Sequence, residues 1–309
     1  MRGTLRECCG IAPKRASVLR VSTKSGFTLM ELLVVLAIIS ALMGMLLPAL
    51  GKARRQARAT IGIRRLGEIT MAVNTFAADN SNRYPPSVAT VGVEDRWNWQ
   101  APNMLTGYLQ RAPGLSRSVS AYLHPYIADA DVMFCPNGPQ AYRYRQEAWD
   151  AGDNWDHPET LTVPDAMFGT YCLYWNYVGY RGEDKGLFRG PNGPARGYRE
   201  SSVVVSDYLG YDHWRNRLAY GSCEQFSDAE IVDVTSISAS FWSTPGNETT
   251  EELRRLRIKL HAGHVDGHVE SCTPADTRAM YVIIRPETGD PYPPGTGPGT
   301  FYVPRVGLR

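Results

Sequence analysis

The segment HAGHVDGHVE, residues 261–270, carries the densest set of side chains that can bind a metal. Imidazole nitrogens and carboxylate oxygens are common ligands of transition-metal ions. Asp-Gly at its centre is also a strong signal for a two-residue type I′ turn between two strands, and we favour this structural interpretation. Alternate residues of a strand share a face, so the hairpin could still present a metal site. The candidate ligands are His264, Asp266 and His268, with His261 nearby.

An acidic loop, WDAGDNWDHPE at 149–159, offers oxygen ligands suited to a hard cation such as calcium. The alternative, which we favour, is a solvated polar loop. A second acidic group is a weaker candidate. The sequence therefore predicts no cofactor, with calcium kept as an alternative at the first loop. The residues concerned are Asp150, Asp153, Asn154 and Asp156 in the first loop, and Asp228, Glu230 and Asp233 in the second group.

Catalytic motifs are absent from the sequence. It contains no G-x-S-x-G, no H-E-x-x-H, no P-loop and no G-x-G-x-x-G. The prediction is that the protein is not an enzyme.

The elements that must position these residues begin with a long apolar run at 27–50, which contains a single charged residue, Glu31. Its 24 residues would form a helix of about 36 Å, enough to cross a hydrocarbon core of about 30 Å. The run is apolar all round, unlike the helix of a soluble core. It is also longer than the apolar part of a secretory signal, and no A-x-A cleavage site follows it. A transmembrane helix is the favoured interpretation, although basic residues on both sides leave its orientation open.

The stretch KSGFTLME at 24–31, followed by LLVVLAIISALMGMLLPAL, resembles the N-terminal signature of type IV pilins and type II secretion pseudopilins. The resemblance covers a short basic leader, a glycine and a phenylalanine at the cut, a glutamate five residues later, an apolar helix and a proline at position 48. It implies that a prepilin peptidase cleaves between Gly26 and Phe27 and methylates the new amine of Phe27. The leader, 1–26, would then be discarded together with Cys8 and Cys9.

The same resemblance implies a topology and a mode of assembly. The N-terminus would start in the cytoplasm, residues 27–50 would span the inner membrane once, and the head would be periplasmic or extracellular. Glu31 would pair with the N-terminal amine of a neighbouring subunit, since an unpaired carboxylate in hydrocarbon costs several kcal/mol. The alternative is that Glu31 reaches the lipid headgroups. Pseudopilins often hold calcium in a head-domain loop, which is the further reason to consider the acidic loop.

Six basic residues at 52–65 follow the apolar run, whereas 81–309 holds 21 Lys and Arg against 27 Asp and Glu, a net charge of −6. The acidic balance argues against nucleic acid as a partner of the head. We expect the basic side chains of this group either to contact lipid headgroups or to form ion pairs with acidic residues of neighbouring subunits. It comprises Lys52, Arg54, Arg55, Arg58, Arg64 and Arg65.

The expected fold is α+β: a long helix over 27–80, packed through a stripe of Leu66, Ile69, Val73 and Phe76 on an antiparallel sheet in a head domain at 81–309. Glycines and Pro48 predict a bend or a local break in this helix. Strands are expected at 171–177, 201–208 and 235–242. A helix is expected to start at 273–276, and a Pro/Gly-rich extended tail is expected over 286–309.

Four cysteines lie in the predicted head, at Cys135, Cys172, Cys223 and Cys272. If the head is exported, they predict two disulfides whose pairing stays open.

A weaker resemblance links the head to pilin-like proteins that end in a motif known as H-X9-DG. Its basis is the order of FCP at 134–136, YCLYWNYVG at 171–179, a strand at 203–207 and DGHVE at 266–270. The spacing departs from that motif, because His264 and His261 precede Asp266 by only one and four intervening residues.

The main hypothesis is therefore a structural pilin-like or pseudopilin subunit, assembled with other pilin subunits into a pilus or a type II secretion pseudopilus. The alternative is a membrane-anchored binding module whose aromatic side chains capture a glycan or another surface ligand without polymerising. All seven tryptophans lie between Trp97 and Trp242.

Overall fold

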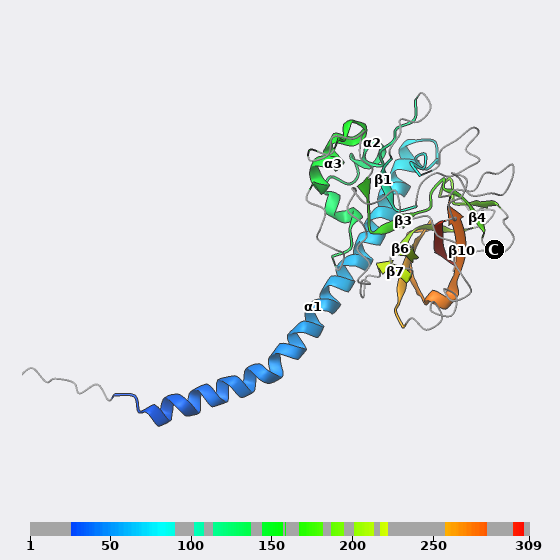
Figure 1. Ribbon diagram of the computed structural model, residues 1–309. Helices are drawn as coiled ribbons and strands as arrows, with labels where there is room; N and C mark the ends of the chain where they lie inside the picture. Colours follow the sequence, from blue (N-terminus) through cyan, green and yellow to red (C-terminus); the bar gives the residue numbers. More distant parts are fainter. Residues whose placement is uncertain are drawn as a thin grey trace, which may run out of the picture. The chain divides into compact units, whose positions relative to one another are not determined.

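The computed structural model describes residues 26–89, 102–107, 114–136, 144–156, 158, 167–181, 187–194, 201–212, 217–221, 257–282 and 299–305 (Figure 1). The chain divides into two compact units, Met1–Leu50 and Gly51–Arg309, and the division falls inside one helix. A long helix followed by antiparallel sheets confirms the expected α+β class.

The long helix, α1, runs over Leu29–Asp79 and ends one residue before the expected boundary. It continues through Pro48 without a break, so the predicted local break does not occur. Proline lacks the N–H that would bond the carbonyl of Gly44, and one lost hydrogen bond does not interrupt the helix here.

The part of α1 after Gly51 has one buried face, as the apolar stripe predicted. Leu66, Ile69 and Val73 are fully buried. Phe76 is half-buried and packs edge-to-face on two aromatic rings, those of Tyr122 and Tyr126, with centroids 6.3 and 6.0 Å away. This half of the helix is therefore part of the core of the second unit.

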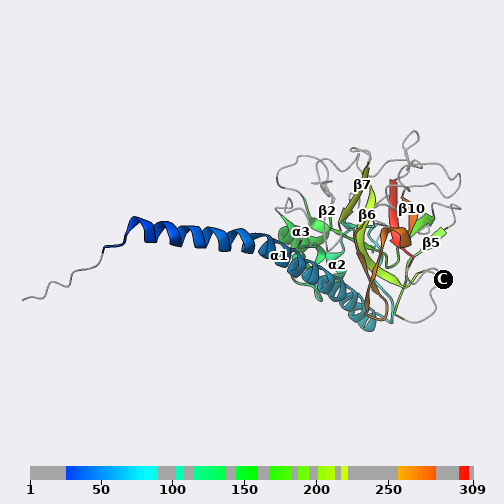
Figure 2. The ribbon, with the colours of Figure 1, turned by 90° about the horizontal axis from the view of Figure 1, so that it is seen from below.

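Within the described residues, the main sheet has nine strands and every pairing between them is antiparallel. Figure 2 shows part of this sheet, with β6, β7 and β10 labelled. The order along the sheet is β5-β4-β10-β11-β6-β8-β9, and β3 and β7 also pair with β6. The strands are β3 (Tyr171–Leu173), β4 (Val178–Arg181), β5 (Leu187–Arg189), β6 (Val203–Asp212), β7 (Arg217–Gly221), β8 (Leu260–His264), β9 (Val269–Cys272), β10 (Thr277–Val282) and β11 (Gly299–Pro304).

The ten-residue strand β6 connects the two halves of this sheet. Its first part pairs with β3 and β8, and its second part pairs with β7 and β11. Val203, Val204 and Val205 are fully buried, as expected for a β-branched run covered on both faces. The strand predicted at 201–208 is thus confirmed over 203–208; it begins two residues later than predicted and extends four residues further.

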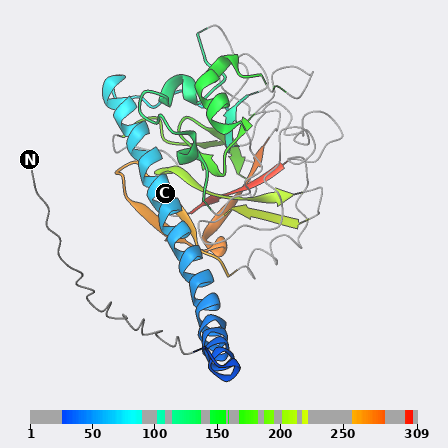
Figure 3. The ribbon, with the colours of Figure 1, turned by 90° about the vertical axis from the view of Figure 1, so that its left-hand side faces the viewer.

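The hairpin formed by β8 and β9 packs directly on α1 (Figure 3). Gly263 allows this close approach, because a Cβ there would lie 2.2 Å from Thr70 Oγ1 and 3.4 Å from the Leu66 carbonyl. The Asn74 side chain donates a hydrogen bond to the carbonyl of Val265 over 3.0 Å. The second half of α1 and the hairpin are therefore held together by both packing and polar contacts.

Short elements cover the remaining core. The three described tryptophans, Trp149, Trp155 and Trp175, are all buried among other aromatic and aliphatic side chains. The short elements are β1 (Met104–Thr106), which pairs with β2 (Met167–Phe168), the helices α2 (Ser120–Leu123) and α3 (Arg145–Ala151), and the 3-10 turns η2 (Ala130–Met133), η3 (Gly152–Asn154) and η5 (Pro274–Asp276).

Three expectations about the head need correction. Residues 299–304 of the expected tail form β11, which lies between β10 and β6 and buries Phe301 and Val303. The capping box of Thr273 and Asp276 is present, but it closes a single 3-10 turn that runs directly into β10. The strand expected at 171–177 is limited to β3. The strand expected at 235–242 lies outside the described residues.

Candidate functional site

The start of α1 carries the candidate cleavage and assembly residues. Gly26 and Phe27 precede the helix and are exposed. Thr28 and Glu31 form a reciprocal capping box: the Thr28 N–H and hydroxyl each donate to Glu31 Oε2 over 2.9 Å, and the Glu31 N–H donates to Thr28 Oγ1 over 3.3 Å. Within the single chain, the Glu31 carboxylate is therefore bonded to its own helix N-terminus.

Every residue from Gly26 to Arg58 is exposed in the chain taken alone. The exposed set includes the large apolar side chains of the first unit, such as Leu29 and Met45, which are 81% and 79% exposed. Among the described helices, α1 is the one long and apolar enough to cross a membrane. Such an apolar surface requires a non-aqueous environment or other protein chains to cover it.

The six basic residues after the apolar run fall into two groups. Arg64 pairs with Glu68 over 2.9 Å, and Arg65 donates to the carbonyl of Phe134 over 2.6 Å. The other four, Lys52, Arg54, Arg55 and Arg58, are exposed, and no acidic group in the described part of the chain pairs with them. These four are the basic residues left for lipid headgroups or for other subunits.

The His-rich hairpin has a different turn from the one expected. The Gly267 N–H bonds to the His264 carbonyl over 2.8 Å, the His264 N–H bonds to the His268 carbonyl over 2.9 Å, and only Gly267 has a positive φ in this turn. This is a three-residue loop with glycine in the left-handed position, not a two-residue type I′ turn. The longer loop places His264 directly opposite His268.

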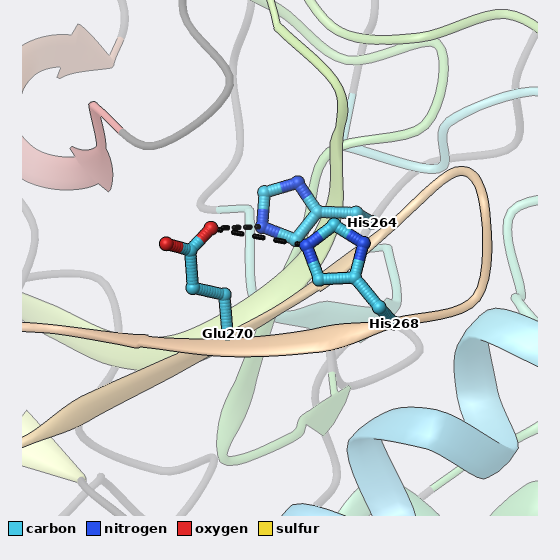
Figure 4. A group of neighbouring side chains, drawn as sticks. All are labelled: His264, His268 and Glu270. Atoms are coloured by element: carbon cyan, nitrogen blue, oxygen red, sulfur yellow. Dashed lines mark ion pairs between the residues drawn. The ribbon is translucent and has the colours of Figure 1, made fainter.

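The two opposed histidines are stacked, and a carboxylate that the sequence analysis did not single out lies beside them (Figure 4). The ring centroids of His264 and His268 are 4.4 Å apart and the rings are parallel. Glu270 Oε2 lies 3.8 Å from Nε2 of each ring. Strand alternation could have identified Glu270, because it follows His268 by two residues on the same face.

Asp266 and His261, the other two candidates in this segment, lie elsewhere. Asp266 Oδ1 contacts Nδ1 of His268, on the side of the ring away from Glu270. His261 is buried on the opposite face of β8, where its Nδ1 lies 2.9 Å from Asp207 Oδ2. Asp207 also accepts a hydrogen bond from the His261 N–H over 2.9 Å, so this pair joins β8 to β6.

The acidic loop uses its oxygens on protein partners. Asp153 Oδ1 accepts from the Ser118 N–H over 2.9 Å, and Asp150 Oδ1 accepts from the Gln146 side chain over 2.8 Å and contacts His124. The buried Arg117 guanidinium donates to the main-chain carbonyls of Asp153, Gly107 and Trp155.

Arg117 brings positive charge next to the main-chain carbonyls of the acidic loop. Burial lowers the pKa of Arg117, and the charges of Asp153 and Asp156 oppose that shift. Among the described residues, these aspartates do not form a group of three ligands close enough to share an ion. The weaker group at Asp228, Glu230 and Asp233 lies outside the described residues.

The described cysteines are buried. Cys172 and Cys272 are thiols, and burial raises the pKa of each to about 12. Cys135 is buried too, and its N–H donates to Thr170 Oγ1 over 2.5 Å. Cys223 lies outside the described residues. The expected two disulfides are therefore not formed among the described cysteines.

Comparison with protein families gives a match at the N-terminus. Residues 21–47 match the family model described as the prokaryotic N-terminal methylation motif, which supports a type IV pilin-like protein. No curated protein and no solved structure matches the chain. The matched range contains Gly26, Phe27 and Glu31 together with much of the exposed apolar surface of α1.

Proposed function

We propose that this chain is a structural pilin-like subunit, anchored by the first half of α1 and assembled through Glu31 into a pilus or a secretion pseudopilus. A prepilin peptidase removes 1–26 and methylates the amine of Phe27. The observation that carries the proposal is the methylation-motif match over 21–47, at the start of an exposed apolar helix.

The exposure of 26–58 supports assembly together with membrane anchoring. In the chain taken alone this surface is exposed, so we expect lipid to cover it before assembly and other subunits to cover it afterwards. The head is then the exported part, on the far side of the inner membrane from the cytoplasmic leader.

The rival function, an aromatic-rich module that binds a glycan, has less support. Trp149, Trp155 and Trp175 are at most 5% exposed, so none of these three offers a ring face to a ligand. The other four tryptophans lie outside the described residues.

Glu31 has two stabilising roles that differ in size. As the acidic member of the Thr28 capping box it satisfies donors at the exposed N-terminus of the helix. Paired with a neighbour's N-terminal amine in an apolar fibre core it matters more, because breaking a buried ion pair costs about 3–5 kcal/mol. That energy corresponds to about 100-fold or more in subunit association.

Three substitutions separate these roles. Glu31→Ala removes both, and Glu31→Gln keeps a hydrogen-bond acceptor at the cap but removes the charge. Thr28→Ala removes the two contacts of the Thr28 hydroxyl but keeps the main-chain N–H contact and the charge. We expect Glu31→Ala and Glu31→Gln to reduce incorporation into sheared fibres by about 100-fold, and Thr28→Ala to reduce it by less than about 10-fold. Incorporation is measured as the ratio of chain in the sheared fibre fraction to chain in the membrane fraction.

The pattern of losses decides the proposal. Equal losses in Thr28→Ala and Glu31→Ala would mean that only the cap matters. Wild-type behaviour of both Glu31 variants would exclude assembly through this carboxylate and would favour the non-polymerising module. Intact-mass measurement of the membrane-extracted wild type should show a chain that starts at methylated Phe27, and Gly26→Val should leave the leader attached.

A further inference from the structure

We propose that His264, His268 and Glu270 form a binding site for one divalent transition-metal ion on the head, a property separate from assembly. Their ligand atoms lie within 4.8 Å of one another, and each ring Nε2 lies 3.8 Å from Glu270 Oε2 (Figure 4). Two imidazoles and one carboxylate suit zinc, iron(II), nickel or copper better than calcium or magnesium, which prefer oxygen ligands alone.

The hairpin brings the three ligands together through its register. The three-residue turn places His264 opposite His268, and Glu270 extends from β9 on the same face. β8 is held on its other edge by β6, and Gly263 packs against α1. The ligands therefore sit on a backbone supported from two sides, which reduces the entropy lost when a metal binds.

His264 provides an independent sign of a missing partner. Its side chain is 3% exposed, and Nε2 has no hydrogen-bond partner among the described residues. Buried polar atoms are almost always bonded, so an orphan nitrogen that lies 3.8 Å from a carboxylate and beside a second imidazole points to a ligand.

Both imidazoles are also held by their second nitrogens. Ser202 Oγ lies 2.9 Å from Nδ1 of His264, and Asp266 contacts Nδ1 of His268. When Nδ1–H donates to these oxygens, the lone pair of each ring is on Nε2, as metal ligation requires.

The site must contract slightly to bind an ion. Metal–ligand bonds near 2.0–2.1 Å place tetrahedral ligand atoms about 3.3 Å apart, which is shorter than the present separations. The parallel rings must also tilt so that their lone pairs converge. His268 and Glu270 are 51% and 46% exposed and can make this movement, whereas His264 is fixed. Their exposure leaves the remaining coordination positions to water.

The test measures zinc binding to the full-length chain in detergent, with the metal alone as the probe. We expect one equivalent to bind in equilibrium dialysis. His268→Ala and Glu270→Gln should each lower the affinity by more than about 10-fold, because loss of an outer-shell partner alone costs about 10–100-fold. Asp266→Asn, which changes an outer-shell partner, should lower the zinc affinity by about 10–100-fold.

The control is His124→Ala, which removes an exposed histidine paired with Asp150 outside the hairpin. It should bind zinc as the wild type does. A cobalt(II) spectrum without thiolate charge-transfer bands should exclude the cysteines as ligands. Circular dichroism checks that each variant is folded. If His268→Ala does not fold, the zinc affinity of Glu270→Gln is the measurement that tests the proposal.

Lack of saturable zinc binding by the wild type would overturn the proposal, as would unchanged affinity in a folded Glu270→Gln variant. Neither result depends on fibre formation. A failure here would leave the proposed assembly function intact, and the reverse also holds.

Discussion

The two halves of α1 belong to one continuous helix but have opposite relations to the rest of the chain. From Gly26 to Arg58 every residue is exposed, whereas the stripe that includes Leu66, Ile69 and Val73 is fully buried. The first half is apolar all round, and the second is apolar on one side. The difference shows that the head buries the apolar face of the second half, whereas the apolar surface of the first half requires lipid or other chains to cover it.

The largest expected effect is the loss of head stability when a buried side chain in the second half of α1 is truncated, compared with the same truncation in the first half. Leu66→Ala removes a fully buried side chain and should lower the free energy of unfolding of the head by about 2–5 kcal/mol. Leu36→Ala, at a position that is 55% exposed, should leave it unchanged. Thermal unfolding of the detergent-solubilised chain, followed by near-UV circular dichroism of the aromatic head, measures both. Equal shifts would mean that the first half also packs on the head.

A smaller effect is expected where the hairpin meets the helix. Gly263→Ala places a methyl group 2.2 Å from Thr70 Oγ1 and 3.1 Å from Val205 Cγ1, so it should destabilise the head by about 1–3 kcal/mol. Gly44→Ala, where an added Cβ meets nothing within 4 Å, is the matched control and should not destabilise. The double variant Gly263→Ala/Thr70→Ala removes the closest atom and should recover part of the loss. No loss in Gly263→Ala would show that the helix and the hairpin are not in close contact.

The smallest effect distinguishes the two groups of basic residues. Arg65→Ala removes the hydrogen bond to the Phe134 carbonyl and should cost about 1.5 kcal/mol in head stability. Arg58→Ala should leave head stability unchanged and weaken the association of the chain with anionic vesicles, because its exposed charge has no acidic partner among the described residues. Vesicle co-sedimentation measures the second effect. A loss of head stability in Arg58→Ala, or weaker vesicle association in Arg65→Ala with unchanged head stability, would contradict this division of the basic residues into two groups.

The sequence predicted much of the long N-terminal helix and less of the head. The α+β class, the end of α1 and its buried stripe follow from helical periodicity, which is a local property. Asp-Gly located the hairpin, yet the turn type depended on the glycine conformation and on the pairing with β6. The three-residue loop is what places His264 opposite His268. Glu270 was missed although strand alternation places it on the same face as His268.

The other differences between the predictions from sequence and the structure also arise from contacts between residues far apart in the chain. Pro and Gly around Gly299–Pro304 suggested a tail, but β10 and β6 recruit this segment as an interior strand. The acidic loop was interpreted as a solvated polar loop with calcium as the alternative, and the sequence did not reveal that Arg117, more than 30 residues earlier, donates to the main-chain carbonyls of this loop. The side chains that lie next to a local motif cannot be read from the motif itself.

By itself, the sequence determined the helix, its apolar first half and the motif around Gly26, Phe27 and Glu31, because these depend on residues that are neighbours along the chain. Only the tertiary structure decided that Arg117 donates to the carbonyls of the acidic loop and that His264, His268 and Glu270 converge. The physical reason is distance along the chain: local spacing specifies a helix or a turn, whereas a site is specified by the register between elements that the sequence keeps apart.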